Sequence, residues 1–119
     1  MEDLIEDELA EIVIDFTGLD GSEERLQEFF WRENSTAIWA KKIEIIMKRL
    51  FGQNAIPVSI KGTPSQLSSF ASALGSEKRY MQTARDLGLG DPRTTRNKSR
   101  ATAAAREFHR RTGIEWPFH

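Results

Sequence analysis

The stretch TTRNKSRATAAAREFHRRTG, residues 94–113, decides how the C-terminal half of this chain folds. At about 100° per residue, its small and apolar side chains fall within one arc of a helix, and its arginines fall on the other side. Gly113 then ends the pattern. We therefore predict a helix over 94–112 that packs through one face and presents positive charge on the other. The apolar arc holds Ala101, Ala104, Ala105, Phe108 and Thr112, and the basic side holds Arg96, Arg100, Arg106, Arg110 and Arg111, with Glu107 among them.

The basic stretch belongs to a larger division of charge along the chain. Residues 1–60 carry 13 acidic and 6 basic side chains, a net of −7, whereas residues 61–119 carry 5 acidic and 11 basic side chains, a net of +6. The formal net charge of −1 conceals both values. A basic half of this size indicates an anionic partner, with nucleic acid first among the candidates. The acidic half indicates a second partner or an internal mask for the first.

Length and composition indicate one domain over 1–119. A chain of 119 residues is long enough to bury a core, and its 39% of hydrophobic and 29% of charged side chains are typical of a globular protein. The chain has no cysteine, so it has no disulfide framework and no thiolate metal site. No apolar run approaches the roughly 18 residues of a membrane span, and the acidic start lacks the features of a signal peptide. We expect a cytoplasmic location.

Helical periodicity favours three helices in the acidic half. The first covers 3–16, although the run 12–14 taken alone is also compatible with a strand. The second follows an N-cap at Ser22 and continues to about residue 32, and the third covers 36–51. The apolar face of the first helix comprises Ile5, Leu9, Ile12, Val13 and Phe16.

Residues 55–60 have an extended pattern, in which Ile56, Val58 and Ile60 alternate with other side chains. Pro57 argues against a central strand, because proline cannot donate to the hydrogen-bond ladder. The sequence suggests no partner strand elsewhere in the chain. We interpret the segment as an edge strand that pairs with another copy of the chain, or as an extended connector.

Glycine and proline divide the basic half into helices. Thr63 is an expected N-cap, with Pro64 at the first helical position. Gly75 is expected to interrupt this helix, and a further helix covers 76–87. Residues 88–92, which contain two glycines and Asp91-Pro92, form a loop before the last helix.

These segments predict an all-α fold of about five helices in one compact bundle, with one short extended segment near 55–60. An acidic helical N-terminal unit, 1–52, packs on a basic helical C-terminal unit, 62–119. The two units share one core, because the helices are too few to build two. The aromatic tail at 116–118 is expected to pack back onto the fold.

The stretch 70–81 resembles a helix-turn-helix, a motif whose second helix reads DNA. Ala71 stands where the motif needs a small residue, Gly75 stands in the turn four positions later, and Leu74 supplies the apolar residue before the turn. Ser76 departs from the pattern, which usually has an aliphatic residue there. A plain helical hairpin with solvated charges is the alternative interpretation. The resemblance implies that Lys78, Arg79, Gln82 and Thr83 face DNA.

The last predicted helix is the stronger candidate for a nucleic-acid contact. The planar fork of arginine suits phosphate better than a point charge does, and neutral donors nearby, such as Asn97, Ser99 and Thr102, add phosphate contacts. The alternative is that the basic face forms ion pairs with the acidic first helix or with another molecule. The expected nucleic-acid-binding residues are Lys78, Arg79, Gln82, Thr83, Arg93, Arg96, Lys98, Arg100, Arg106 and Arg110.

Catalytic patterns are missing from the sequence. His109 and His119 are the two histidines, and they do not have a metal-ligand spacing. The chain has no Gly-x-Ser-x-Gly elbow, and the acidic residues of the first helix lack the apolar surroundings that raise a carboxyl pKa. We expect no enzymatic activity, catalytic residue, metal or cofactor.

The first hypothesis is a small non-enzymatic protein that binds DNA or another nucleic acid, of the accessory or regulatory kind found in bacteria and phages. The alternative is a protein–protein interaction module or a homo-oligomer, assembled through complementary acidic and basic halves. A variant of that alternative is an inhibitor whose acidic first helix mimics DNA. We expect no membrane partner.

Overall fold

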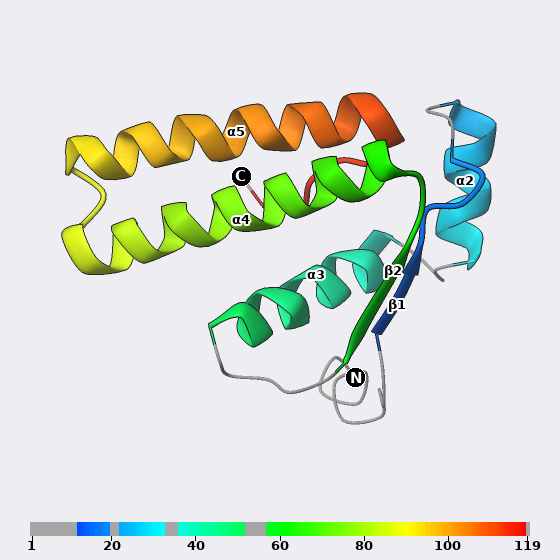
Figure 1. Ribbon diagram of the computed structural model, residues 1–119, viewed down its shortest axis with the longest axis horizontal. Helices are drawn as coiled ribbons and strands as arrows, with labels where there is room; N and C mark the ends of the chain where they lie inside the picture. The colour runs from blue at the N-terminus through cyan, green and yellow to red at the C-terminus, as the bar shows by residue number, and fades with distance from the viewer. Residues whose placement is uncertain (1–11, 20–21, 33–35, 52–56, 119) are drawn as a thin grey trace.

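The computed structural model describes residues 12–19, 22–32, 36–51 and 57–118 of the chain (Figure 1). These residues form two strands and four helices. Their order is β1 (Ile12–Asp15), α2 (Glu23–Arg32), α3 (Thr36–Leu50), β2 (Val58–Lys61), α4 (Pro64–Leu87) and α5 (Pro92–Thr112). The fold is therefore mainly helical, as predicted. The described residues form four helices rather than about five, and a small two-stranded sheet corrects the expected all-α class.

The predicted helix at 3–16 is wrong where the structure describes that segment, because residues 12–15 form the strand β1. Ile12 and Ile14 are fully buried while Val13 between them is 39% exposed, which is the two-residue alternation of a strand. The helical period that grouped Ile12, Val13 and Phe16 on one face is wrong here, because the β-branched run finds a partner strand. The remainder of the predicted helix, 3–11, lies outside the described residues.

That partner strand is β2, which pairs with β1 in parallel. Ile12 lies opposite Val58 and Ile14 opposite Ile60, and the Ile12 amide donates to the Pro57 carbonyl at 2.8 Å. The extended segment predicted near 55–60 is thus confirmed as a strand over 58–61. The prediction that it has no partner within the chain is wrong. Parallel pairing requires a long connection, which α2 and α3 provide.

Helices α2 and α3 begin where their local signals predicted. The Arg25 amide donates to the Ser22 hydroxyl at 3.3 Å, so Ser22 caps α2. Helix α3 ends at Leu50, one residue before the predicted end, and its stripe of Trp39, Ile43 and Ile46 is buried.

Helices α4 and α5 form a long antiparallel pair, the α4–α5 hairpin (Figure 1). Thr63 and Gln66 make a reciprocal capping box at the start of α4, with amide donors at 2.9 and 3.2 Å, and Pro64 follows the cap. The Asp91 carboxylate caps α5 by accepting from the Arg93 amide at 2.8 Å, so α5 begins at Pro92, earlier than predicted. Gly113 ends α5 in the left-handed conformation, as predicted.

The predicted break at Gly75 is wrong, because α4 continues from Pro64 to Leu87. A glycine inside a helix costs about 1 kcal/mol relative to alanine. Phe70 and Leu74 before it and Glu77 after it are buried against the rest of the molecule, and this packing outweighs the cost. The helix-turn-helix interpretation of 70–81 is therefore also wrong, since the stretch is one continuous helix.

An aromatic cluster at the centre joins both halves of the chain. The Phe16 ring lies 5.4 Å from the Phe70 ring and 5.8 Å from the Phe108 ring, measured between centroids. Residues 113–118, the tail segment, return to this cluster, and Trp116 meets Phe108 edge-to-face at 5.5 Å. The tail therefore packs back onto the fold, as predicted. The rings come from the residue after β1, from α2, α3, α4 and α5, and from the tail: Phe16, Phe29, Trp39, Phe70, Phe108 and Trp116.

Candidate functional site

Four of the arginines on the α4–α5 hairpin have acidic neighbours, beginning with Arg85, which contacts Asp86 at 3.2 Å. Arg93 contacts Asp91 at 3.1 Å. Arg110 and Arg111 both contact Glu107, at 2.6 and 2.5 Å, and Arg111 also donates to the Ser65 hydroxyl. Their hydrogen bonds hold the pKa values of Asp91 and Glu107 below the ordinary range, so both carboxylates stay ionised. Among the predicted site residues, Arg93 and Arg110 are therefore partly neutralised within the fold.

Other predicted cations have no acidic side chain within ion-pair distance among the described residues, although the charge of Arg96 also helps to lower the pKa of Asp91. Arg96, Lys98, Arg100 and Arg106 are exposed on α5, and Arg79 is exposed on α4. None of these five forms an ion pair with any residue that the structure describes. They are held by two long helices rather than by loops, so their spacing is fixed. We call them the open cations.

The open cations of α5 lie on two sides of that helix, and Arg79 lies on α4. Arg93, Arg96 and Arg100 follow one another at three and four residues, which places them in one stripe. Lys98 and Arg106 belong to a second stripe, where they line one hollow of about 280 Å³ together with Ser99 and Thr102. The structure therefore divides the single basic face that the sequence predicted.

On α4, the predicted contact residues form part of a different surface. Arg79, Gln82 and Thr83 line a hollow of about 370 Å³ with Asn97 of α5. The Asn97 amide donates to the Thr83 hydroxyl at 3.3 Å, so Thr83 joins the two helices. Lys78 is half-buried and does not line this hollow. These side chains are brought together by the hairpin and not by a recognition helix.

The second stripe of α5 continues into two further hollows. Towards the hairpin loop, Lys98 lines a hollow of about 280 Å³ with Tyr80, Leu89, Thr94 and Thr95. In the other direction, Thr102 and Arg106 line a third hollow against the tail segment. Because neighbouring hollows share residues, they form one interrupted groove along α5, the α5 groove.

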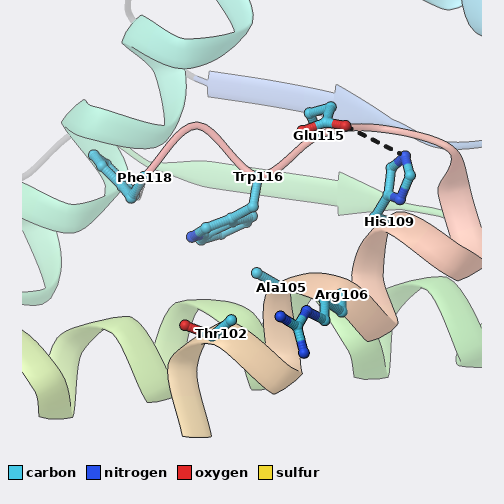
Figure 2. Close-up of a pocket in the computed structure, with 7 residues that line it drawn as sticks. All are labelled: Thr102, Ala105, Arg106, His109, Glu115, Trp116 and Phe118. Carbon is cyan, nitrogen blue, oxygen red and sulfur yellow. Dashed lines mark ion pairs between the residues drawn. The ribbon is translucent and has the colours of Figure 1, made fainter. Parts of the chain in front are cut away.

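The third hollow, which we call the tail pocket, has a volume of about 300 Å³. Figure 2 shows Trp116 on the tail side and Thr102, Ala105 and Arg106 on the α5 side. At one end, the imidazole Nε2 of His109 lies 3.7 Å from a carboxylate oxygen of Glu115. The remaining lining residue is Phe118, which is half-buried.

Sequence reasoning missed the aromatic side of this groove. It assigned Trp116 and Phe118 to packing, with a docking peptide or a dimer strap as the alternative, and it gave Tyr80 no role. The Trp-Pro-Phe order of the tail signals a bulky terminal segment, but no local pattern tells which helix that segment meets. The hydroxyl groups of Ser99 and Thr102 were recognised, and the structure places both beside open cations.

The described residues do not support a metal site or a membrane-spanning helix. No group of three or more histidine, cysteine or acidic side chains there is arranged to hold a metal ion. No helix within that part of the chain combines the length and apolar character needed to cross a membrane.

Comparison with protein-family models, with curated proteins and with solved structures gave no significant match.

Proposed function

We propose that this chain is a nucleic-acid-binding accessory protein that holds the phosphate backbone along the α4–α5 hairpin. The observation that carries the proposal is the set of open cations, which are exposed on rigid helices and form no ion pair with described residues. Positive charge that the fold does not neutralise is available to an external anion.

The composition of the α5 groove suits the oxygens of a phosphate group. Arg106 offers a planar fork of donors, and the hydroxyls of Ser99 and Thr102 stand within the same hollow as Lys98. Arginine, lysine and hydroxyl side chains are the groups that most often contact phosphate oxygens in protein–DNA complexes. These contacts position a nucleic acid without reading its bases, so we expect little sequence preference.

A salt titration of DNA binding tests the proposal. We would compare the wild type with Arg96→Ala/Arg100→Ala, using a fluorescent duplex of mixed sequence and measuring anisotropy. Loss of two phosphate contacts lowers the slope of log K against log salt by about 2. The matched control is Arg25→Ala/Arg49→Ala, which removes the same charge from the exposed surface of α2 and α3.

The control should bind nearly as the wild type does, because its arginines lie in the other half of the chain. No binding by the wild type at low salt, to either duplex or single strand, would overturn the proposal. The basic face would then serve a protein partner, which is the alternative that the divided charge leaves open. Sedimentation at increasing concentration and salt would follow, to test self-association.

A further inference from the structure

The tail pocket differs from the rest of the α5 groove because it combines an aromatic wall with a cation. Its α5 side supplies the Arg106 guanidinium and the Thr102 hydroxyl. Its tail side supplies the rings of Trp116 and Phe118 (Figure 2). Its volume of about 300 Å³ is at the lower end of the range for small-molecule sites.

The aromatic wall is fixed before any ligand arrives. The Trp116 indole N–H donates to the buried Glu77 carboxylate at 3.1 Å, and the ring packs edge-to-face on Phe108. Phe118 in turn meets Trp116 at 6.2 Å between ring centroids. Trp116 is buried whereas Phe118 is half-buried, so Phe118 is the more accessible of the two aromatic residues. A wall that is already ordered lowers the entropic cost of binding.

The opposite wall leaves room for a flat group and attracts an anion. Ala105 projects a single methyl group into the pocket, between the larger side chains of Thr102 and Arg106 (Figure 2). The Arg106 guanidinium forms no ion pair with a described residue. The lining holds one carboxylate, Glu115, which lies 3.7 Å from His109 Nε2, one helical turn beyond Arg106, so an anion is favoured on the Thr102 side of Arg106.

We infer that the tail pocket binds one unpaired nucleoside phosphate, with the base against Phe118 and the phosphate on Arg106 and Thr102. The inference rests on the proposed function and narrows it to strand ends and single strands. A base within a continuous duplex cannot enter, because its faces are covered by neighbouring pairs and unstacking costs a few kcal/mol. An unpaired base presents its ring surface at no such cost.

The tail pocket is also continuous with the neighbouring hollow of the α5 groove. Arg106 and Thr102 line both the tail pocket and the next hollow, where Lys98 and Ser99 follow. Lys98 and Arg106 are separated by about 12 Å along the helix axis. If the terminal base of a nucleic-acid strand occupies the tail pocket, the phosphates that follow it lie along the α5 groove.

The test compares three probes on the full chain: a single strand of about 12 nucleotides, the corresponding duplex with blunt ends, and adenosine monophosphate. We expect the single strand to bind more tightly than the duplex by anisotropy. Phe118→Ala should weaken single-strand binding by about fivefold or more and leave duplex binding unchanged. Phe118→Tyr keeps the ring and should retain wild-type affinity. Circular dichroism would establish that both variants fold.

The outcomes separate the two proposals. Equal affinity for both DNA probes, or single-strand affinity that Phe118→Ala does not change, would overturn the inference while the proposed function stands. If none of the three probes binds at low salt, both the proposed function and the tail-pocket inference are overturned. Shifts in the Phe118 ring resonances with adenosine monophosphate alone would identify a free nucleotide as a ligand, whereas shifts only with the strand would identify a strand end. Either result supports a nucleoside phosphate site.

Discussion

The β1–β2 sheet and the α4–α5 hairpin are held together by different kinds of interaction. The sheet joins Ile12 to Val58, so its pairing depends on segments far apart in the chain. The hairpin joins neighbouring helices whose ends are fixed by local caps at Thr63 and Asp91. The sheet contributes buried side chains to the aromatic cluster, whereas the hairpin also presents the open cations.

This difference indicates that stability and binding are separable in this molecule. The groups that hold the fold are the buried rings, whereas the cations proposed to bind a ligand are exposed on α4 and α5. Trp116 and Phe118 are the exception, because they pack on the cluster and also line the tail pocket. Variants in the cluster should lose the fold, and variants at the open cations should lose only binding.

The largest effect is expected for Phe16→Ala. The Phe16 ring is fully buried and lies within about 6 Å of the rings of Phe29, Trp39, Phe70 and Phe108. Removing it leaves a cavity between both halves, and the free energy of unfolding should fall by about 3–5 kcal/mol. Urea denaturation followed by circular dichroism would measure the change.

The matched control for this variant is Leu89→Ala in the hairpin loop. Leu89 is 72% exposed, so its truncation should change the free energy of unfolding by less than about 0.5 kcal/mol. A loss of several kcal/mol in this control, or a near-neutral Phe16→Ala, would contradict the separation of roles.

A smaller effect of opposite sign is expected for Gly75→Ala. A methyl group built on Gly75 meets nothing within 4 Å, and the residue lies inside a continuous helix. Alanine should therefore stabilise the protein by about 0.5–1 kcal/mol. A turn with left-handed backbone at this position would make the same substitution destabilising, so the sign of the change distinguishes the two local structures.

The smallest effect concerns pH at the start of α5. Hydrogen bonds from Arg93 lower the pKa of Asp91 in the folded protein below its ordinary value of 3.8. The ionised Asp91 carboxylate therefore stabilises the folded protein. This contribution is fully present above pH values near the ordinary pKa and is lost as the pH falls through the lower pKa of the folded state. Asp91→Asn keeps a capping side chain but removes the titration. The stability advantage of the wild type over Asp91→Asn should therefore shrink below about pH 4.

Urea midpoints at neutral and acidic pH would measure this difference. Glu107→Gln serves as a parallel case, because Arg110 and Arg111 lower the pKa of Glu107 in the same way. Equal pH dependence in the wild type and both variants would show that these ion pairs do not contribute to folding. High salt should reduce the differences, since the groups are near the surface.

Local signals in the sequence predicted much of the helical structure. The caps at Ser22, Thr63 and Gly113 each satisfy backbone groups within a few residues, so they can be recognised without knowing the fold. The sequence failed at β1 because a four-residue run fits both a strand and a helix, and its partner strand lies in another part of the chain. It failed at Gly75 because distant packing outweighs a local cost.

The candidate site was predicted in part for the same reason. The exposed cations of α5 follow from helical spacing alone, and Lys98, Arg100 and Arg106 lie on the surface as expected. The aromatic wall of the tail pocket depends on where the chain returns after Gly113, which is a property of the whole fold. Trp116 reaches α4 and α5 only through contacts that no local pattern contains.

The parallel pairing of β1 and β2 has a consequence for synthesis of the chain. Strand β1 emerges from the ribosome early, but its hydrogen-bond partner is complete only when Lys61 has been added. Until then, Ile12 and Ile14 have no partner strand. The chain between the two strands must also lose conformational entropy before the hydrogen bonds between them can form. The α4–α5 hairpin forms from adjacent segments and has no such delay. Nascent chains that end before residue 61 therefore expose an unpaired β-branched segment, the kind of segment that promotes aggregation.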